Sequence, residues 1–214
     1  MTIATITLEG RSDELAAGAR SYMYKVLAES FSYPTVEFAR DLGSGEWQAR
    51  LSTLSQHLPF QISHPAEASF AALKPDVLQQ GYVSTFEVGV GRPYCPLYEG
   101  SHRSGRMKLM EELVRFYEHF GLKTQAGDHA DHLCAELEFM HYMAFKEAAA
   151  LAHNDPVPDI RRAQRDFLDR HLCRWLPRVR SRLQSARELP TFYLAAAGLA
   201  DEFCRRDLAW LKAA

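Results

Sequence analysis

The 214-residue chain has only four cysteines, and no two of them are spaced as a CxxC pair. That spacing excludes the usual zinc knuckle and the thioredoxin-type redox pair. No stretch approaches the roughly 18 uninterrupted apolar residues that a membrane-spanning helix needs. Residues 1–11 lack the basic start and the apolar run of a secretory signal. We therefore expect a cytoplasmic protein with reduced cysteines and no stable membrane insertion.

The chain also has little excess of either charge, because its formal net charge is only -2. A protein built to coat nucleic acid would be far more basic. One segment is locally basic: residues 161–187 contain nine arginines and only two aspartates. It could form a basic face for RNA, but no aromatic or glycine-rich nucleic-acid module accompanies it. A solvated helix face is the favoured interpretation, so we expect no nucleic-acid partner.

Apolar residues recur mainly at helical spacing, and proline or glycine stands at most of the breaks. No convincing strand alternation appears. The sequence predicts an all-α fold, a single globular domain over residues 1–214 with roughly eight or nine helices, and a disordered or extended N-terminus at 1–11. The expected helical segments are 12–31, 35–42 (stopped by Gly43), 47–58, segments opening at Pro65 and Pro75, 107–120, about 131–152, 160–183 (kinked or split at Pro177) and 190–211.

The helical pattern fails over residues 87–105, which read EVGVGRPYCPLYEGSHRSG. Four glycines and two prolines prevent any sustained period there. Irregular loops of this length are uncommon and are often functional, although a plain surface connector is the alternative. Tyr94 and Tyr98 favour a packed loop.

Histidine and glutamate crowd residues 128–141, where a metal site is conceivable. The residues that share a helix face or an ExxH spacing are His129, His132, Glu136, Glu138 and His141. A second ExxH pair, Glu99 with His102, lies in the irregular segment. A carboxylate-bridged di-iron site needs further inward glutamates from other helices, and no such set is evident. We predict no metal and no cofactor; the alternative is a non-haem iron or manganese enzyme that uses segment 128–141.

Enzymatic signatures are otherwise missing. The chain has no GxSxG nucleophile elbow, and its four cysteines stand in no catalytic signature. GVGRPYCP matches neither GxGxxG nor GxxxxGK, and its prolines remove the amides that would cradle a phosphate. The sequence therefore predicts a protein that is not an enzyme.

Four blocks in order are recognisable: GYVSTFEVG from Gly81, PYCPLYEGSHR from Pro93, VRFYEHFGL from Val114 and DHADHLCAELEFM from Asp128. Together they resemble the TorD/DmsD/NarJ family of redox-enzyme maturation chaperones. They are most similar to the chaperones of type II dimethyl sulfoxide reductase-like molybdoenzymes. The resemblance covers residues 22–203 and is strongest over residues 82–143.

The family's helix-start motif reads acidic-x-Pro-Asp-His before a Glu-Leu-x-Phe-Met run. Here Asp128 takes the acidic place and Ala130 replaces the proline. The matching residues are Asp131, His132, Glu136, Leu137, Phe139 and Met140. The resemblance implies an all-helical chaperone without catalysis. Its partner would be the apo catalytic subunit of a molybdopterin-containing oxidoreductase, whose N-terminal region, often a twin-arginine signal, is held until the cofactor is inserted. Both a monomer and a domain-swapped dimer remain open.

We predict that the irregular segment and the acidic helix start converge on one peptide-sized groove. Aromatic and methionine side chains would receive the apolar part of the client, and carboxylates would face its arginines. The alternative is that the apolar members are core and that Asp131 caps a helix. The predicted client-binding residues are Tyr82, Phe86, Pro96, Tyr98, Glu99, His102, Asp131, His132, Glu136 and Met140.

Overall fold

The computed structural model describes residues 11–63, 70, 73–87, 93–123, 129–186 and 191–214. These residues form an all-α fold, as the sequence predicts, and their one β-type pairing is a single bridge between Tyr98 and His132. The predicted character of residues 1–10, the helix opening at Pro65 and the acidic position Asp128 lie outside the described residues. The elements are α1 (Ser12–Ser30), α2 (Val36–Ser44), α3 (Glu46–Ser55), α4 (Pro75–Tyr82), the π-helix η1 (Val83–Glu87), the 3-10 helix η2 (Glu99–Ser101), α5 (Arg106–His119), α6 (Leu133–Ala152), α7 (Pro158–Arg170), α8 (Leu172–Gln184) and α9 (Thr191–Ala213).

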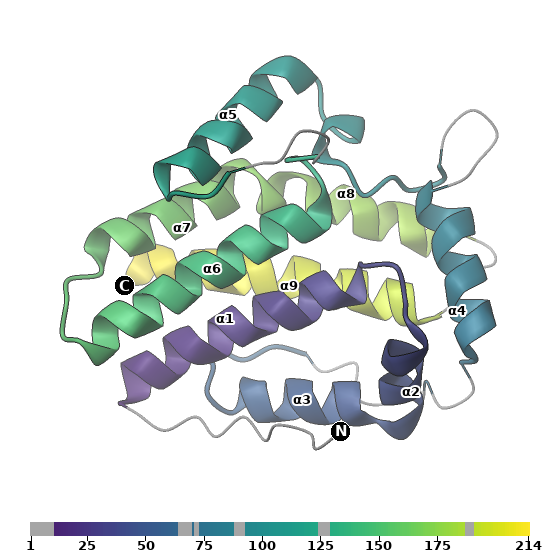
Figure 1. Cartoon of the computed structure of the whole chain (residues 1–214), viewed down its shortest axis with the longest axis horizontal. Coiled ribbons are helices and arrows are strands. Elements are labelled where there is room, and N and C mark those ends of the chain that lie inside the picture. The colour runs from purple at the N-terminus through teal and green to yellow at the C-terminus, as the bar shows by residue number, and fades with distance from the viewer. Residues whose placement is uncertain (1–10, 64–69, 71–72, 88–92, 124–128, 187–190) are drawn as a thin grey trace.

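The long helices α1 and α6 lie side by side and form the most extensive helix pair of the described structure (Figure 1). Helix α9 passes behind them and packs against α7 and α8. Helices α2 and α3 lie beneath α1, α4 closes one end, and α5 sits above α6 and α7 (Figure 1). One cluster of buried apolar side chains runs through these helices, with Trp47, Phe139, Trp175 and Phe203 among its members. Within the described chain, every helix is too short or too polar to traverse a bilayer.

Glycine and threonine set the ends of the short helices. The Thr35 hydroxyl accepts the backbone N–H of Phe38 at 3.1 Å and so caps α2. The predicted stop at Gly43 is wrong, because α2 continues through Gly43 to Ser44. Gly45 makes the break instead: its φ of 82° is left-handed, a conformation that glycine adopts without steric cost. At the end of α5, Gly121 has a φ of 79° and is the predicted terminator.

The long basic segment divides into α7 and α8, but not where the sequence predicts. The break lies at His171, where the backbone departs from helical geometry. Pro177 is accommodated inside α8 with an exposed ring. His171 is almost fully buried, and its Nδ1 lies 2.9 Å from the carboxylate of Glu99. A long-range contact to a buried side chain therefore accompanies the break, and local helix propensity does not predict it.

Candidate functional site

The irregular segment and the start of α6 meet in space. The backbone N–H of Glu99 donates to the carbonyl of Asp131 at 2.8 Å, and the N–H of Leu133 donates to the carbonyl of Leu97 at the same distance. These bonds form the antiparallel bridge that pairs Tyr98 with His132. The structure thus brings together the two segments that the sequence predicts to converge.

Helix α6 is capped by His132, so the alternative interpretation of Asp131 as the helix cap is wrong. The Nδ1 of His132 accepts the backbone N–H of Cys134 at 3.2 Å. Burial lowers the pKa of His132, which keeps this nitrogen neutral and able to accept. Asp131 turns the other way: its Oδ2 accepts the N–H of Gly100 at 3.1 Å. The aspartate therefore ties the irregular segment to α6 instead of closing the helix.

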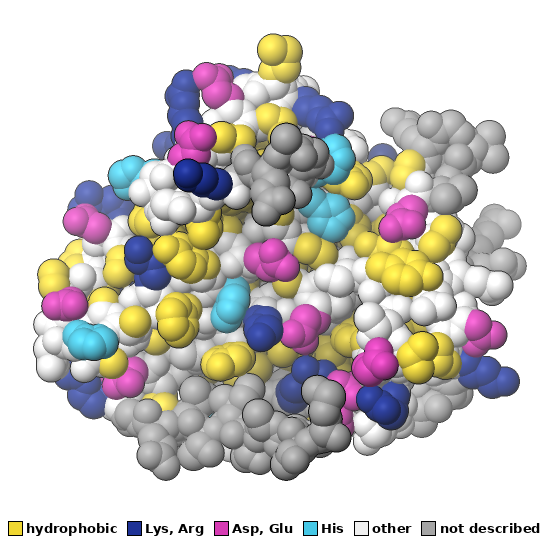
Figure 2. Space-filling view, in the orientation of Figure 1, with side chains coloured by type: hydrophobic (Ala, Val, Ile, Leu, Met, Phe, Trp, Pro, Cys, Tyr) yellow, Lys and Arg dark blue, Asp and Glu magenta, His cyan; other side chains and the backbone are white. Residues whose placement is uncertain are grey.

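A groove of about 480 Å³ lies beside this junction, between the end of α5 and the first turns of α6. Its described lining is Tyr117, Leu122, Lys123, His129, Ala130, His132, Cys134, Ala135, Glu138, Phe139 and Tyr142. The ring of Tyr98 stands next to it, 5.1 Å from the ring of His129 and 5.0 Å from that of His132. We call this depression and Tyr98 together the Tyr98 groove. Figure 2 shows hydrophobic and histidine side chains near the start of α6 on this face.

Of the predicted client-binding residues, Tyr98 and His132 stand at the groove with partly exposed side chains. Tyr82, Phe86 and Met140 belong to the core cluster, and the hydroxyl of Tyr82 donates to the carbonyl of Phe31 at 3.1 Å. In this conformation their apolar surface packs against the protein itself.

Pro96 and His102 are also interior. The Nε2 of His102 lies 2.7 Å from the carbonyl of Pro96, and its ring packs on Trp175. Burial lowers the pKa of His102, so the neutral imidazole is favoured. This pair holds the irregular segment against α8 and presents nothing to solvent.

Glu99, Asp131 and Glu136 are fully buried beneath the irregular segment, and we call them the buried carboxylate cluster. Glu99 pairs with Arg103 and, at 2.9 Å, with His171. The Oε2 of Glu136 accepts the indole N–H of Trp175 at 3.1 Å. Burial, followed by the neighbouring Glu99 carboxylate, raises the pKa of Glu136 well above its ordinary value of 4.5. These acids therefore belong to the interior of the protein.

Sequence reasoning overlooked the polar groups that do line the groove. Glu138 is exposed, and the hydroxyl of Tyr142 donates to the carbonyl of Phe120 at 3.2 Å. Cys134, Glu138 and Tyr142 are spaced i, i+4, i+8, so they form one stripe along α6. This stripe could have predicted the groove-facing side of α6, because it lies away from Leu137 and Met140, which are buried.

The residues considered for a metal site point apart. Glu136 faces Trp175, His132 caps α6, and the Nδ1 of His141 lies 2.8 Å from the Ser21 hydroxyl. Across the described ranges, no three His, Cys, Asp or Glu side chains are grouped to hold a metal ion. The structure gives the metal-dependent alternative no ligand set in that part of the chain.

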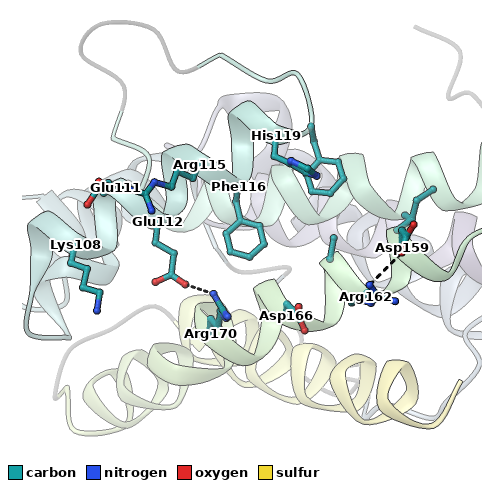
Figure 3. Close-up of a pocket in the computed structure, with 13 residues that line it drawn as sticks. Lys108, Glu111, Glu112, Arg115, Phe116, His119, Asp159, Arg162, Asp166 and Arg170 are labelled. Carbon is teal, nitrogen blue, oxygen red and sulfur yellow. Dashed lines mark hydrogen bonds and ion pairs between the residues drawn. The ribbon is translucent and has the colours of Figure 1, made fainter.

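A second, open groove of about 840 Å³ runs between α5 and α7 (Figure 3). Its lining includes the apolar side chains of Phe116 and Ile160 and charged side chains of both signs. Most of these lining charges form ion pairs within the protein: Glu111 with Arg115, Glu112 with Arg170, Asp159 with Arg162, and Asp166 with Arg165, which stands outside the lining. These pairs leave no excess of one sign to select a ligand, so the Tyr98 groove is the better candidate.

Known proteins match the chain across most of its length. The family model described as "Nitrate reductase delta subunit" matches residues 41–181. This chain belongs to that family, the TorD/DmsD/NarJ group of redox-enzyme maturation chaperones. Two curated members are the selenate reductase assembly chaperone protein of Thauera selenatis, 36% identical over 82% of this chain and 82% of the relative, and the perchlorate reductase assembly chaperone protein of Dechloromonas aromatica, 33% identical over 86% of each.

A third relative of this TorD-family chain is the dimethyl sulfide dehydrogenase assembly chaperone protein of Rhodovulum sulfidophilum. It is 34% identical over 89% of this chain and 80% of its own length. These relatives are named for the assembly of a redox enzyme and not for a reaction of their own. As a member of this chaperone family, the chain is not an enzyme, in agreement with the sequence prediction.

Proposed function

We propose that this TorD-family protein is a dedicated cytoplasmic assembly chaperone. Its client is the apo catalytic subunit of a molybdenum oxidoreductase. The chaperone binds the client's N-terminal region, a twin-arginine signal where the client carries one, and holds it until the cofactor has been inserted. The names of its relatives support the client class, because each assembles a reductase or a dehydrogenase.

The main support for the binding site is the pairing of Tyr98 with His132 beside an open groove. The bridge fixes an aromatic ring at the edge of a largely apolar depression. Aromatic side chains lose little conformational entropy on binding and offer a large contact area, which suits them to anchor a partner. An apolar segment of a client would lie along the α6 stripe and pack against Tyr98.

The groove also carries a charge suited to a basic segment. Glu138 is exposed within it, whereas Glu99, Asp131 and Glu136 are covered. A surface carboxylate orients an incoming cation and speeds its approach more than it adds affinity. In this proposal Glu138 makes the first contact with the client's arginines.

The test is a calorimetric titration, in which the client's N-terminal peptide is added to the purified protein and the heat of binding is measured. The client is first identified as the subunit that co-purifies with this protein from its native cell. Tyr98→Ala is expected to weaken binding by about 10-fold, because it removes a central aromatic contact. Glu138→Gln is expected to weaken it by about 3-fold and to flatten its dependence on salt.

Matched controls exist in the same chain. Tyr94 is an exposed tyrosine of the same irregular segment, but its hydroxyl contacts the carbonyl of Arg182, away from the groove. Glu111 is an exposed glutamate on α5 that pairs with Arg115. Tyr94→Ala and Glu111→Gln should bind as wild type does. Folded Tyr98→Ala and Glu138→Gln proteins with unchanged affinity would rule out this groove.

A further inference from the structure

Two arginines cover the buried carboxylate cluster, Arg103 from the irregular segment and Arg106 from the first turn of α5. Arg103 contacts the Oε1 of Glu99, and Arg106 approaches the Oδ2 of Asp131. Both acids are fully buried, whereas the side chains of Arg103 and Arg106 are 32% and 60% exposed. In each pair the arginine is therefore the solvent-facing partner, and the carboxylate lies beneath it.

The cover over Asp131 is incomplete. The Nε of Arg106 is 3.9 Å from Oδ2, too far for a hydrogen bond, and Oδ1 has no partner among the described residues. A buried carboxylate oxygen without a donor is unfavourable, so this position would gain from a better-placed cation. An arginine at the surface, by contrast, gives up little when it leaves a loose pair.

Gly100 makes room for this arrangement. A Cβ at that position would lie 2.8 Å from the Cγ of Arg106 and 2.8 Å from the Oδ2 of Asp131. The arginine stem thus crosses the backbone of η2 at the one residue type that leaves space for it.

We propose that Arg103 and Arg106 are internal substitutes for the arginines of a client, which displace them from Glu99 and Asp131 when the client binds. The inference rests on the proposed function and names the chemistry of the bound segment as a pair of neighbouring guanidinium groups. One arginine replaces another, so neither buried carboxylate is left without a counter-charge during the exchange. Tyr98 directly precedes Glu99 and His132 directly follows Asp131, so the two bridge residues beside the groove are chain neighbours of the two carboxylates.

Two blocked synthetic peptides test the exchange, one containing Arg-Arg-Ala-Leu-Leu and the other Gln-Gln-Ala-Leu-Leu. Binding is followed by calorimetry with wild type and Arg106→Gln. Removal of the internal competitor is expected to tighten binding of the arginine peptide by about 3- to 10-fold. Binding of the glutamine peptide should not change. Adding Asp131→Asn to Arg106→Gln should reverse the gain in affinity for the arginine peptide, because Glu99 and Glu138 are then the remaining carboxylates.

The control is Arg115→Gln, which removes the same charge from an exposed position on α5. It corrects for the general effect of lowering the protein's positive charge. The exchange is overturned if Arg106→Gln binds the arginine peptide no better than Arg115→Gln does. That result would leave the proposed chaperone function intact. If neither peptide binds the wild type, Arg106→Gln or Arg115→Gln, both the exchange and the proposed groove fail.

Discussion

Replacement of Arg20 by methionine is expected to destabilise the protein by about 3–5 kcal/mol, because it removes the cation paired with buried Asp207 and leaves buried Glu147 with Arg161 alone. The guanidinium is fully buried and contacts Asp207 at 2.6 Å, Glu147 at 2.7 Å and Gln164 at 2.5 Å. These contacts join α1 to α9, α6 and α7. Burial alone would lower the pKa of Arg20, but Asp207 and Glu147 raise it above its ordinary value, so the cation persists at any pH at which the protein is folded.

Urea unfolding at neutral pH measures the loss as a lower midpoint with an unchanged slope. Arg162→Gln is the matched control, because Arg162 pairs with Asp159 at 3.5 Å on the surface of α7 and both side chains are largely exposed. Its midpoint should stay close to that of wild type. An Arg20→Met midpoint equal to wild type would mean that the cost of burying these charges already cancels their attraction.

Replacement of Glu136 is expected to have opposite effects depending on the new side chain. Glu136→Ala should cost about 2–4 kcal/mol, because it opens a cavity and leaves the indole N–H of Trp175 without its acceptor. Glu136→Gln keeps that acceptor and can donate a hydrogen bond to Glu99. The amide therefore imitates the protonated acid and should be at least as stable as wild type at neutral pH.

The pH dependence follows from the raised pKa of Glu136. In the folded protein the carboxyl keeps its proton above the ordinary value of 4.5, while in the unfolded chain it ionises near that value. The folded state then binds more protons, so this contribution to stability is fully present below pH 4.5 and is lost as the pH rises toward the folded pKa.

Urea midpoints measured from about pH 4 to pH 8 separate the two variants from wild type. The Glu136→Gln protein should lose less stability across that range than wild type does. Glu138→Gln, two residues along α6 and exposed, should keep the wild-type profile. Identical profiles for wild type and Glu136→Gln would show that Glu136 does not hold a proton in the folded state.

The site could be predicted from the sequence only in part. The irregular segment 87–105 was visible as a break in helical spacing and the acidic helix start as a recognisable motif. Their pairing through Tyr98 and His132 agrees with the predicted convergence. The burial of Glu99 and Asp131 could not be predicted from the sequence, where acidic residues are expected at the surface. Their depth depends on Arg103, His171 and other residues distant in the chain.

The sequence by itself determined the all-α class, most helix boundaries and the family, because helical spacing and chain-breaking residues act over a few neighbouring positions. Only the tertiary structure decided that the helix breaks at His171 and not at Pro177, and that His132 and not Asp131 caps α6. It also decided which acids face solvent, since Glu138 lines the groove and Glu136 lies against Trp175 on the other side of the same helix. The break at His171 and the burial of Glu136 depend on packing between segments far apart in the chain, and no local pattern encodes them.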